Sequence, residues 1–251
     1  MSAAYAALTS AGYRAYVRDR TTVFFTFAFP LVFLVLFGYI FRGQQVSGSG
    51  AYIGYIAPGI LAWGVGNAAL FATAFTLMNW RRDDILRLIW RTPAPLSAIL
   101  SARYALALAV GLAQAVLFLG IAALPVFGLH LASSWPLALP VLALGVAAFL
   151  ALGAVVGSRA DTPEAVAAIA NFLMVPMAFL SGSFYPSDLM PGWLQDFSKI
   201  LPLHYLNSGV EGALAHRGGV LQTVTADAGL AAFTLVFGLF AARTFRWSNK
   251  T

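Results

Sequence analysis

An uncharged run of 28 residues, Ala51–Met78, constrains the fold of this chain more than any other feature. As a helix, a run of this length crosses about 30 Å of hydrocarbon with residues to spare. The rest of the 251-residue chain has the same character, being 60% hydrophobic and 10% charged. Lipid offers no hydrogen bonds to a bare backbone, so spanning segments must be helices or strands of a closed barrel. Long unbroken apolar runs exclude the alternating strands of a barrel, and we predict an all-α integral membrane protein.

Five further apolar runs are long enough to cross a membrane, which gives six transmembrane helices. We place them at about 23–41, 54–78, 104–124, 135–157, 165–184 and 222–242, within a single transmembrane domain that covers residues 1–251. Thr162-Pro163-Glu164 has the composition of a helix start, with an N-cap, a first-turn proline and a first-turn acid. This pattern sets the beginning of the fifth span.

Two other segments are expected to lie at the membrane surface. Residues 1–21 place Arg14, Arg18 and Arg20 among aromatic and aliphatic residues, which is typical of an amphipathic interfacial helix. A cleaved signal peptide is the alternative, but no small-residue cleavage site follows the first apolar run. Residues 186–217 alternate apolar and polar stretches and contain prolines, which predicts short re-entrant or interfacial helices on the extracytoplasmic side.

The distribution of basic residues predicts the orientation. Six spans put both termini on one side, and the breaks on that side hold twelve of the 15 basic residues. The other side holds Arg42, Lys199 and Arg217. By the positive-inside rule, both termini are cytoplasmic, and the protein belongs in the cell (inner or plasma) membrane. The net charge of +6 is therefore attributed to topology and not to nucleic-acid binding.

A charged island, residues 80–97 with the sequence WRRDDILRLIWRTPAPLS, separates the second and third spans. As a helix it has an apolar and a charged face, and Pro93 and Pro95 end it. A short amphipathic helix held between two spans suits a docking surface for a cytoplasmic partner. The alternative is a solvated loop that only carries topogenic charge. The predicted docking residues are Arg81, Arg82, Asp83, Ile85, Leu86, Arg87, Ile89 and Trp90.

The sequence lacks the motifs that several kinds of catalysis and ligand binding require. There is no G-x-x-x-x-G-K-[ST] motif, and Lys199 and Lys250 are the only lysines, so the chain has no P-loop for ATP. H-E-x-x-H, G-x-S-x-G and cysteine are also absent, and the three histidines are scattered. We predict no catalytic residue, no metal site and no cofactor in this chain. Asp227 is the only acid placed inside a span, near its start, where we expect an interfacial role.

Two stretches together resemble the ABC-2 type transporter permeases. The island ending in Thr92-Pro93 resembles the family's cytoplasmic loop between spans two and three. Residues 176–215 are similar to the family's fifth span and the segment after it, through Phe184-Tyr185-Pro186, Pro191-Gly192-Trp193, and Pro202 with Tyr205. Arg82-Asp83-Asp84 and Leu201-Pro202 depart from the family's commoner residues. The order of these motifs within a six-span chain extends the resemblance over nearly the whole sequence.

The resemblance implies a permease subunit of an ATP-driven exporter. It implies two permeases side by side, either two copies or a sister pair, and separate ATP-binding subunits that hold ATP and Mg²⁺. The implied substrate is hydrophobic or amphipathic: a drug, a lipid or a lipid-linked glycan. An ATP-independent channel or secondary transporter is the alternative, although only Pro58 and Pro176 suggest broken helices. An intramembrane enzyme is disfavoured because no nucleophile and base are paired.

Three functional surfaces follow from this hypothesis. We expect a substrate path between the subunits, lined by polar and adaptable side chains of the second and fifth spans: Asn67, Thr73, Thr76, Asn171, Met174 and Met177. Ordinary helix packing is the alternative role for these six. We expect an extracytoplasmic gate at Phe184, Tyr185, Trp193 and Tyr205. Small residues of the fifth span, such as Ala168 and Ala170, predict dimerisation through the first and fifth spans.

Overall fold

The computed structural model describes residues 9–10, 12–14, 16–46, 50–85, 96–214 and 219–244. Within these ranges, six helices are long and apolar enough to cross a membrane. They are α2 (Arg20–Ile40), α3 (Tyr52–Arg82), α5 (Leu96–Ala122), α6 (Ala138–Arg159), α7 (Pro163–Leu180) and α10 (Gly219–Thr244). The predicted all-α membrane fold with six spanning helices is confirmed.

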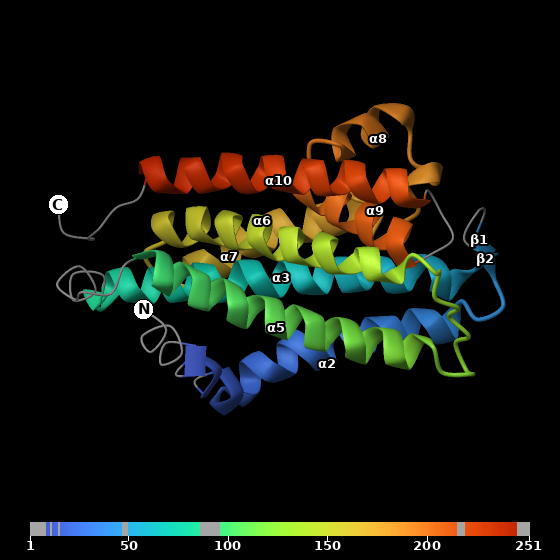
Figure 1. Cartoon of the computed structure of the whole chain (residues 1–251), viewed down its shortest axis with the longest axis horizontal. Coiled ribbons are helices and arrows are strands. Elements are labelled where there is room, and N and C mark those ends of the chain that lie inside the picture. Colours follow the sequence, from blue (N-terminus) through green and yellow to red (C-terminus); the bar gives the residue numbers. More distant parts are fainter. Residues whose placement is uncertain are drawn as a thin grey trace.

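Shorter elements gather at one end of the bundle (Figure 1). A small antiparallel hairpin, β1 (Gln45–Val46) with β2 (Gly50–Ala51), joins α2 to α3. The turn η1 (Trp135–Leu137) leads into α6. Three pieces connect α7 to α10: η2 (Ser187–Leu189), α8 (Gly192–Ser198) and α9 (Pro202–Leu214). We call this end the hairpin end.

The opposite end carries most of the positive charge of the described residues, and we call it the basic end. The starts of α2, α5 and α7 and the ends of α3, α6 and α10 meet there (Figure 1). Basic residues at or near these termini are Arg14, Arg18, Arg20, Arg81, Arg82, Arg103, Arg159 and Arg243. Among the described residues, the hairpin end has Arg42 and Lys199. By charge, the basic end is the predicted cytoplasmic end.

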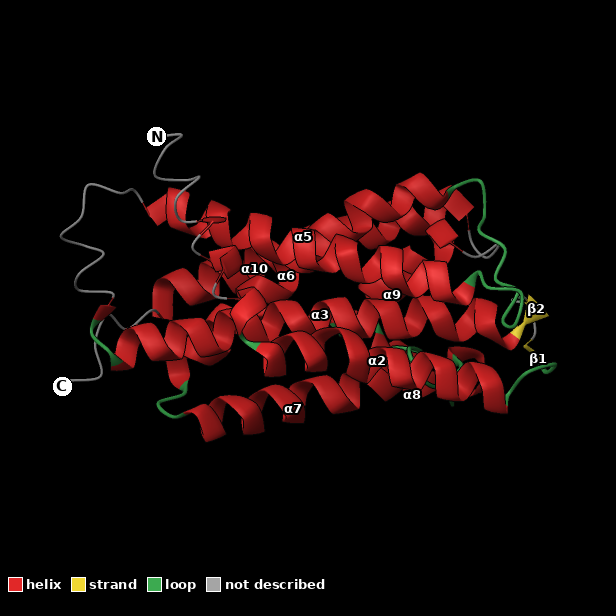
Figure 2. Ribbon diagram, turned by 90° about the horizontal axis from the view of Figure 1, so that it is seen from below, coloured by secondary structure: helices red, strands yellow, loops and turns green. Residues whose placement is uncertain are grey.

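Helix α3 runs through the middle of the bundle (Figure 2) and packs against α2, α5, α6, α7 and α9. Every residue from Ile53 to Gly66 is buried. Helix α6 lies so close to α3 that their backbones touch. A methyl group added at Gly153 would clash with the carbonyl oxygen of Leu70, and one added at Gly157 would clash with that of Ala74. Glycines four residues apart let two helix backbones touch, as in membrane helix pairs. We call this contact the glycine seam.

Some helices begin or end at other residues than the predicted spans, because local backbone geometry sets their ends. Thr162 caps α7 as expected, because its hydroxyl accepts the N–H of Ala165 at 3.2 Å. The same helix stops at Leu180, four residues before the predicted end, since Gly182 takes a φ of +82° that a helix cannot contain. Helix α3 continues four residues beyond the predicted Met78, to Arg82.

The surface segments are partly described. Residues 12–14 and 16–18 are helical, with Tyr13 and Val17 exposed, and Asp19 then caps α2 through the N–H of Thr22 at 3.0 Å. Helix α8 exposes Trp193 and Phe197. The interfacial position of both segments stays a prediction. Helix α9, in contrast, packs into the bundle and buries Leu203, Leu206 and Val210 completely.

Candidate functional site

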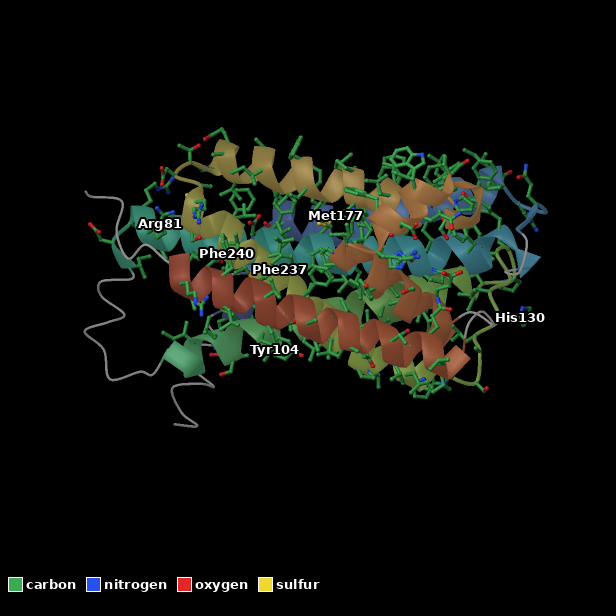
Figure 3. The ribbon with its side chains drawn as sticks, turned by 90° about the horizontal axis from the view of Figure 1, so that it is seen from above. Arg81, Tyr104, His130, Met177, Phe237 and Phe240 are labelled. Atoms are coloured by element: carbon green, nitrogen blue, oxygen red, sulfur yellow. The ribbon has the colours of Figure 1, made fainter. Side chains whose placement is uncertain are left out.

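The end of α3 is anchored inside the protein by Arg81, whose side chain is buried at the basic end (Figure 3). Its guanidinium donates to the carbonyl oxygens of Gly157 at 3.1 Å and Ala160 at 3.2 Å, and to Oδ1 of Asp161 at 3.1 Å. Carbonyls at the end of a helix have no partner within that helix. Arg81 therefore caps α6 from outside and ties α3 to the turn between α6 and α7.

Two more arginines join helices at the basic end through aromatic rings. The guanidinium of Arg103 in α5 lies 4.8 Å from the ring centroid of Trp80 in α3. That of Arg159 in α6 lies 5.5 Å from the ring of Phe240 in α10. Such cation–π contacts are attractive because the ring face is electron-rich. Arginine side chains thus connect four of the six spanning helices at this end.

Immediately after Arg81 the chain leaves the bundle. Arg82 and Asp83 are exposed and pair with each other at 3.2 Å. Asp84 has a φ of +53°, a left-handed conformation that aspartate adopts more readily than most residues, and it turns the chain. Ile85, which follows this turn, has helical backbone. Of the predicted docking residues, Leu86, Arg87, Ile89 and Trp90 lie outside the described residues, so the docking helix stays a prediction.

At the hairpin end, α3 contacts the turn of residues 181–184, which follows α7. The hydroxyl of Tyr55 donates to the carbonyl oxygen of Gly182. Gly59 lies so close to Ser183 that an added methyl group would overlap its backbone. From the other side, the amide of Asn207 in α9 donates to the carbonyl oxygen of Ser181 at 3.1 Å. This turn is therefore held by α3 and α9 together.

The next residue, Phe184, joins an aromatic cluster between α2, α3 and α7. Its ring centroid lies 5.3 Å from that of Trp63, 5.8 Å from Phe33 and 5.7 Å from Phe179. These spacings are typical of attractive aromatic pairs. Helix α3 thus reaches predicted functional residues at both ends of the bundle. At the basic end it leads into the charged island, residues 80–97, which we call the docking segment. At the hairpin end it contacts Phe184, a predicted gate residue.

A polar cavity of about 270 Å³ lies at the hairpin end, between the 181–187 segment, α9 and α10. Its lining consists of Ser181, Ser187, His204, Tyr205, Asn207, Ser208, Glu211, Gln222 and Thr225. None of these is an aliphatic side chain, in a chain that is 60% hydrophobic. Sequence reasoning missed this site. Polar residues three or four apart, at 204, 208 and 211 in α9 and at 222 and 225 in α10, were the available signal.

His204 is oriented within the cavity by Ser198. The Ser198 hydroxyl donates to the carbonyl oxygen of Gln195 at 2.7 Å, so at 3.2 Å it accepts from Nδ1 of His204. This arrangement leaves Nε2 with a free lone pair. Burial, together with the positive charge of Lys199, holds the pKa of His204 below its ordinary value of 6.5. The imidazole is therefore a neutral hydrogen-bond acceptor at pH 7.

Comparison with known proteins agrees with this architecture. The family model described as ABC-2 type transporter matches residues 3–215. This chain belongs to the ABC-2 type transporter family. It is therefore a multi-pass permease, the membrane component of an ABC transporter, and membership implies an ABC ATP-binding partner. The expectation that this chain is not itself an enzyme agrees with its place as the permease component.

Individual relatives are similar to the ABC-2 permease over much of their length. The daunorubicin resistance ABC transporter permease protein DrrB1 of Streptomyces coeruleorubidus is 27% identical, over 88% of this chain and 78% of the relative. The inner membrane transport permease YadH of Escherichia coli (strain K12) is 25% identical, over 72% of each chain. Nodulation protein J of Rhizobium meliloti (strain 1021) is 30% identical, over 61% of this chain and 58% of the relative.

The predicted substrate-path residues of the ABC-2 permease do not share one surface. Asn67, Thr73 and Thr76 are half-buried along α3. Met174 and Met177 are buried, and Figure 3 shows Met177 directed from α7 into the bundle. Asn171 is exposed, whereas both methionines are buried within the bundle. The substrate path itself stays a prediction.

The four predicted gate residues of the ABC-2 permease also lie in different places and do not form one cluster. Phe184 belongs to the cluster described above, whereas Tyr205 packs against Phe233 of α10 at 5.8 Å. Tyr185 and Trp193 are exposed. Phe184 contacts α3 through Trp63. The gating role of all four stays a prediction.

Proposed function

We propose that this ABC-2 permease is the membrane subunit of an ATP-driven exporter, in which α3 carries motion between the two ends. The observation that carries the proposal is the attachment of α3 to a turn at each end, through Arg81 and Tyr55. The two residues are 26 positions apart, which corresponds to a rise of about 39 Å along a helix, more than the thickness of the hydrocarbon layer. Movement of the docking segment would thus reach the opposite face.

The glycine seam makes this transmission mechanically plausible. Backbone contact at Gly153 and Gly157 leaves no side-chain layer that can deform between α3 and α6. Close-packed helices shift as units and resist continuous deformation. A displacement of residues 80–97 would therefore move α3 and α6 together, and the 181–184 turn with them.

The names of the relatives support export of a hydrophobic or amphipathic substrate. One relative is named for daunorubicin resistance, and removal of a drug from the cell is a direct route to resistance. We infer movement of a drug, lipid or lipid-linked glycan out of the cytoplasm or inner leaflet of the cell membrane. Both termini would be cytoplasmic, in keeping with the charge of the basic end.

The proposal requires two partners besides lipid. An ATP-binding subunit, which would hold ATP and Mg²⁺, would seat on the docking segment 80–97. A second permease, identical or a sister chain, would lie against α2 and α7. These helices expose large apolar side chains on their outer faces, among them Phe24, Val32, Phe172 and Phe179.

Reconstitution tests the proposal. The permease and its ATP-binding subunit would be placed in liposomes, and transport of a fluorescent amphipathic probe measured with ATP or a non-hydrolysable analogue. We expect transport only with hydrolysable ATP and both proteins. Equal transport by the permease alone, without ATP, would instead support the channel or secondary-transporter alternative.

A further inference from the structure

Gln114 of α5 is joined to α2 by a hydrogen bond inside the bundle. Its side chain is completely buried, and its amide nitrogen donates to the backbone carbonyl oxygen of Thr26 at 3.0 Å. A helical carbonyl normally accepts from the N–H four residues later, and four residues after Thr26 stands Pro30, which has no N–H. Gln114 therefore supplies the donor that Pro30 removes from α2.

Helix α3 leaves room for this bond at Gly64. A methyl group added there would lie 2.5 Å from the amide nitrogen of Gln114 and 3.5 Å from Cβ of Pro30. The shorter of these distances is too small for two atoms that are not bonded, so a side chain at position 64 would displace the amide. Pro30, Gly64 and Gln114 thus meet where α2, α3 and α5 pack together.

Pro30 divides α2 into two halves that pack differently. Pro30, Leu34 and Gly38 are buried, whereas no residue from 20 to 29 is. Phe24 and Phe25 are more than half exposed, and the start of the helix lies at the edge of the bundle (Figure 1). Proline is the commonest site of a helix kink, because one backbone hydrogen bond is missing there. The first half of α2 is therefore the half with fewer packing restraints, and Pro30 is the point about which it can bend.

The bond to Thr26 satisfies one end of the Gln114 amide. The oxygen at the other end is buried and has no hydrogen-bond partner in the described part of the chain. A buried acceptor without a partner raises the free energy of the arrangement that contains it. This cost offsets part of what the bond contributes, so the bonded arrangement is only weakly favoured over one in which the bond is open.

We propose that Gln114 is a positioning residue that latches the first half of α2 to α5, and that this half swings about Pro30 when the bond opens. The surface segment of residues 12–18, which precedes α2, moves with it. The second half stays in place, because Leu34 and Gly38 are packed in the bundle. The inference concerns the motion of α2 and does not rest on the proposed export function.

Distances between spin labels test the hinge in the full-length protein in nanodiscs, since the chain has no cysteine of its own. Labels at Phe25→Cys and Leu100→Cys, both exposed, report the first half of α2 against α5, and labels at Tyr39→Cys and Val116→Cys report the second half. Gln114→Leu, which removes the donor, should broaden the distance distribution of the first pair and leave the second pair unchanged. An unchanged first pair, or equal broadening of both, would overturn the proposal.

A double-mutant cycle separates the latch from ordinary packing. Pro30→Ala restores the N–H that the Thr26 carbonyl lacks, so it should make Gln114 dispensable. Gln114→Leu alone should lower the ratio of folded to unfolded protein about tenfold, the factor that corresponds to one buried hydrogen bond. Combined with Pro30→Ala it should lower that ratio by less than about twofold, and the first label pair should narrow again. An equal loss in both backgrounds would overturn the proposal.

Two further variants keep the test decisive. Pro176→Ala, at the proline inside α7, is the matched control and should not compensate Gln114→Leu. If Gln114→Leu alone does not fold, we expect the double variant with Pro30→Ala to fold, and failure of both would count against the latch. Gly64→Ala changes neither partner but displaces the amide, so it should broaden the first label pair. A first pair unaffected by Gly64→Ala would contradict the role assigned to Gln114.

Discussion

The guanidinium of Arg81 lies 3.1 Å from Oδ1 of Asp161, yet the arginine side chain is 3% exposed and the aspartate side chain 69% exposed. The two partners thus face different surroundings. Solvent screens the exposed carboxylate, so this ion pair alone contributes about 0–1 kcal/mol. The buried hydrogen bonds from Arg81 to the end of α6 contribute more, because the carbonyls of Gly157 and Ala160 would lose a charged donor without it.

Arg81→Ala should therefore lower the free energy of unfolding by about 2–4 kcal/mol, because it leaves helix-end carbonyls without a donor in a buried site. Asp161→Asn and the exposed Arg82→Ala should each change it by less than about 1 kcal/mol. Thermal unfolding of the purified variants in detergent measures the difference. Equal melting temperatures for Arg81→Ala and Arg82→Ala would contradict the role assigned to Arg81.

The glycine seam should not tolerate a single methyl group. Gly153→Ala places a Cβ against the carbonyl of Leu70 and should cost about 1–3 kcal/mol through overpacking. Gly120→Ala is the matched control in α5, where nothing lies within 4 Å of an added Cβ, and helix propensity should make it neutral or stabilising by up to about 1 kcal/mol. If both variants melt at the same temperature, α3 and α6 are not in backbone contact.

The docking segment should depend on apolar contact more than on charge. Ile89→Asp would bury an unpaired charge against the ATP-binding subunit, at about several kcal/mol. Arg87→Glu should matter less, because exposed ion pairs contribute about 0–1 kcal/mol. Co-purification of the ATP-binding subunit, normalised to the permease level, compares them. Normal recovery of the ATP-binding subunit with Ile89→Asp would contradict a docking role for this segment. A larger loss of that subunit with Arg87→Glu than with Ile89→Asp would indicate that residues 80–97 only carry topogenic charge.

Orientation can be measured directly, because the chain has no cysteine and each introduced thiol is unique. Gln44→Cys and Asp196→Cys, at exposed positions of the hairpin end, should react with a membrane-impermeant maleimide in intact cells. Glu164→Cys, at the exposed start of α7, should react only after the membrane is permeabilised. The reverse pattern would show that the basic end faces outward.

The outer face of α7 is the proposed contact with a second permease. Phe172 is 78% exposed and Met174, two residues away, is fully buried. Phe172→Cys should therefore give cross-linked dimers in membranes, and Met174→Cys should not. Of the two small residues predicted for this contact, Ala168 is exposed and Ala170 is buried within the bundle. Absence of any dimer from cysteines placed along the exposed faces of α2 and α7 would move the interface elsewhere.

The number and positions of the spanning helices were predictable because apolar length alone decides which segments cross lipid. The Thr162 cap was predictable for a similar reason, since a hydroxyl and the N–H three residues later always lie close together at a helix start. The end of α7 was not, because the hydrophobic run continues past Leu180 while Gly182 turns the backbone. Local composition therefore determined which segments form spanning helices, and the predicted and observed helices differ at their ends.

Which face of each helix turns inward was decided only by the tertiary structure. Lipid and the protein interior are equally apolar, so the sequence of a spanning helix does not mark its buried side as a soluble helix does. Met174 and Asn171 therefore seemed equivalent in the sequence, as did Arg81 and Arg82, but in the structure one of each pair is buried and the other exposed. The polar cavity has the same origin, because its residues come from separate segments that only helix packing brings together. The sequence determined what enters the membrane, and close packing with buried hydrogen bonds decided what each side chain contacts there.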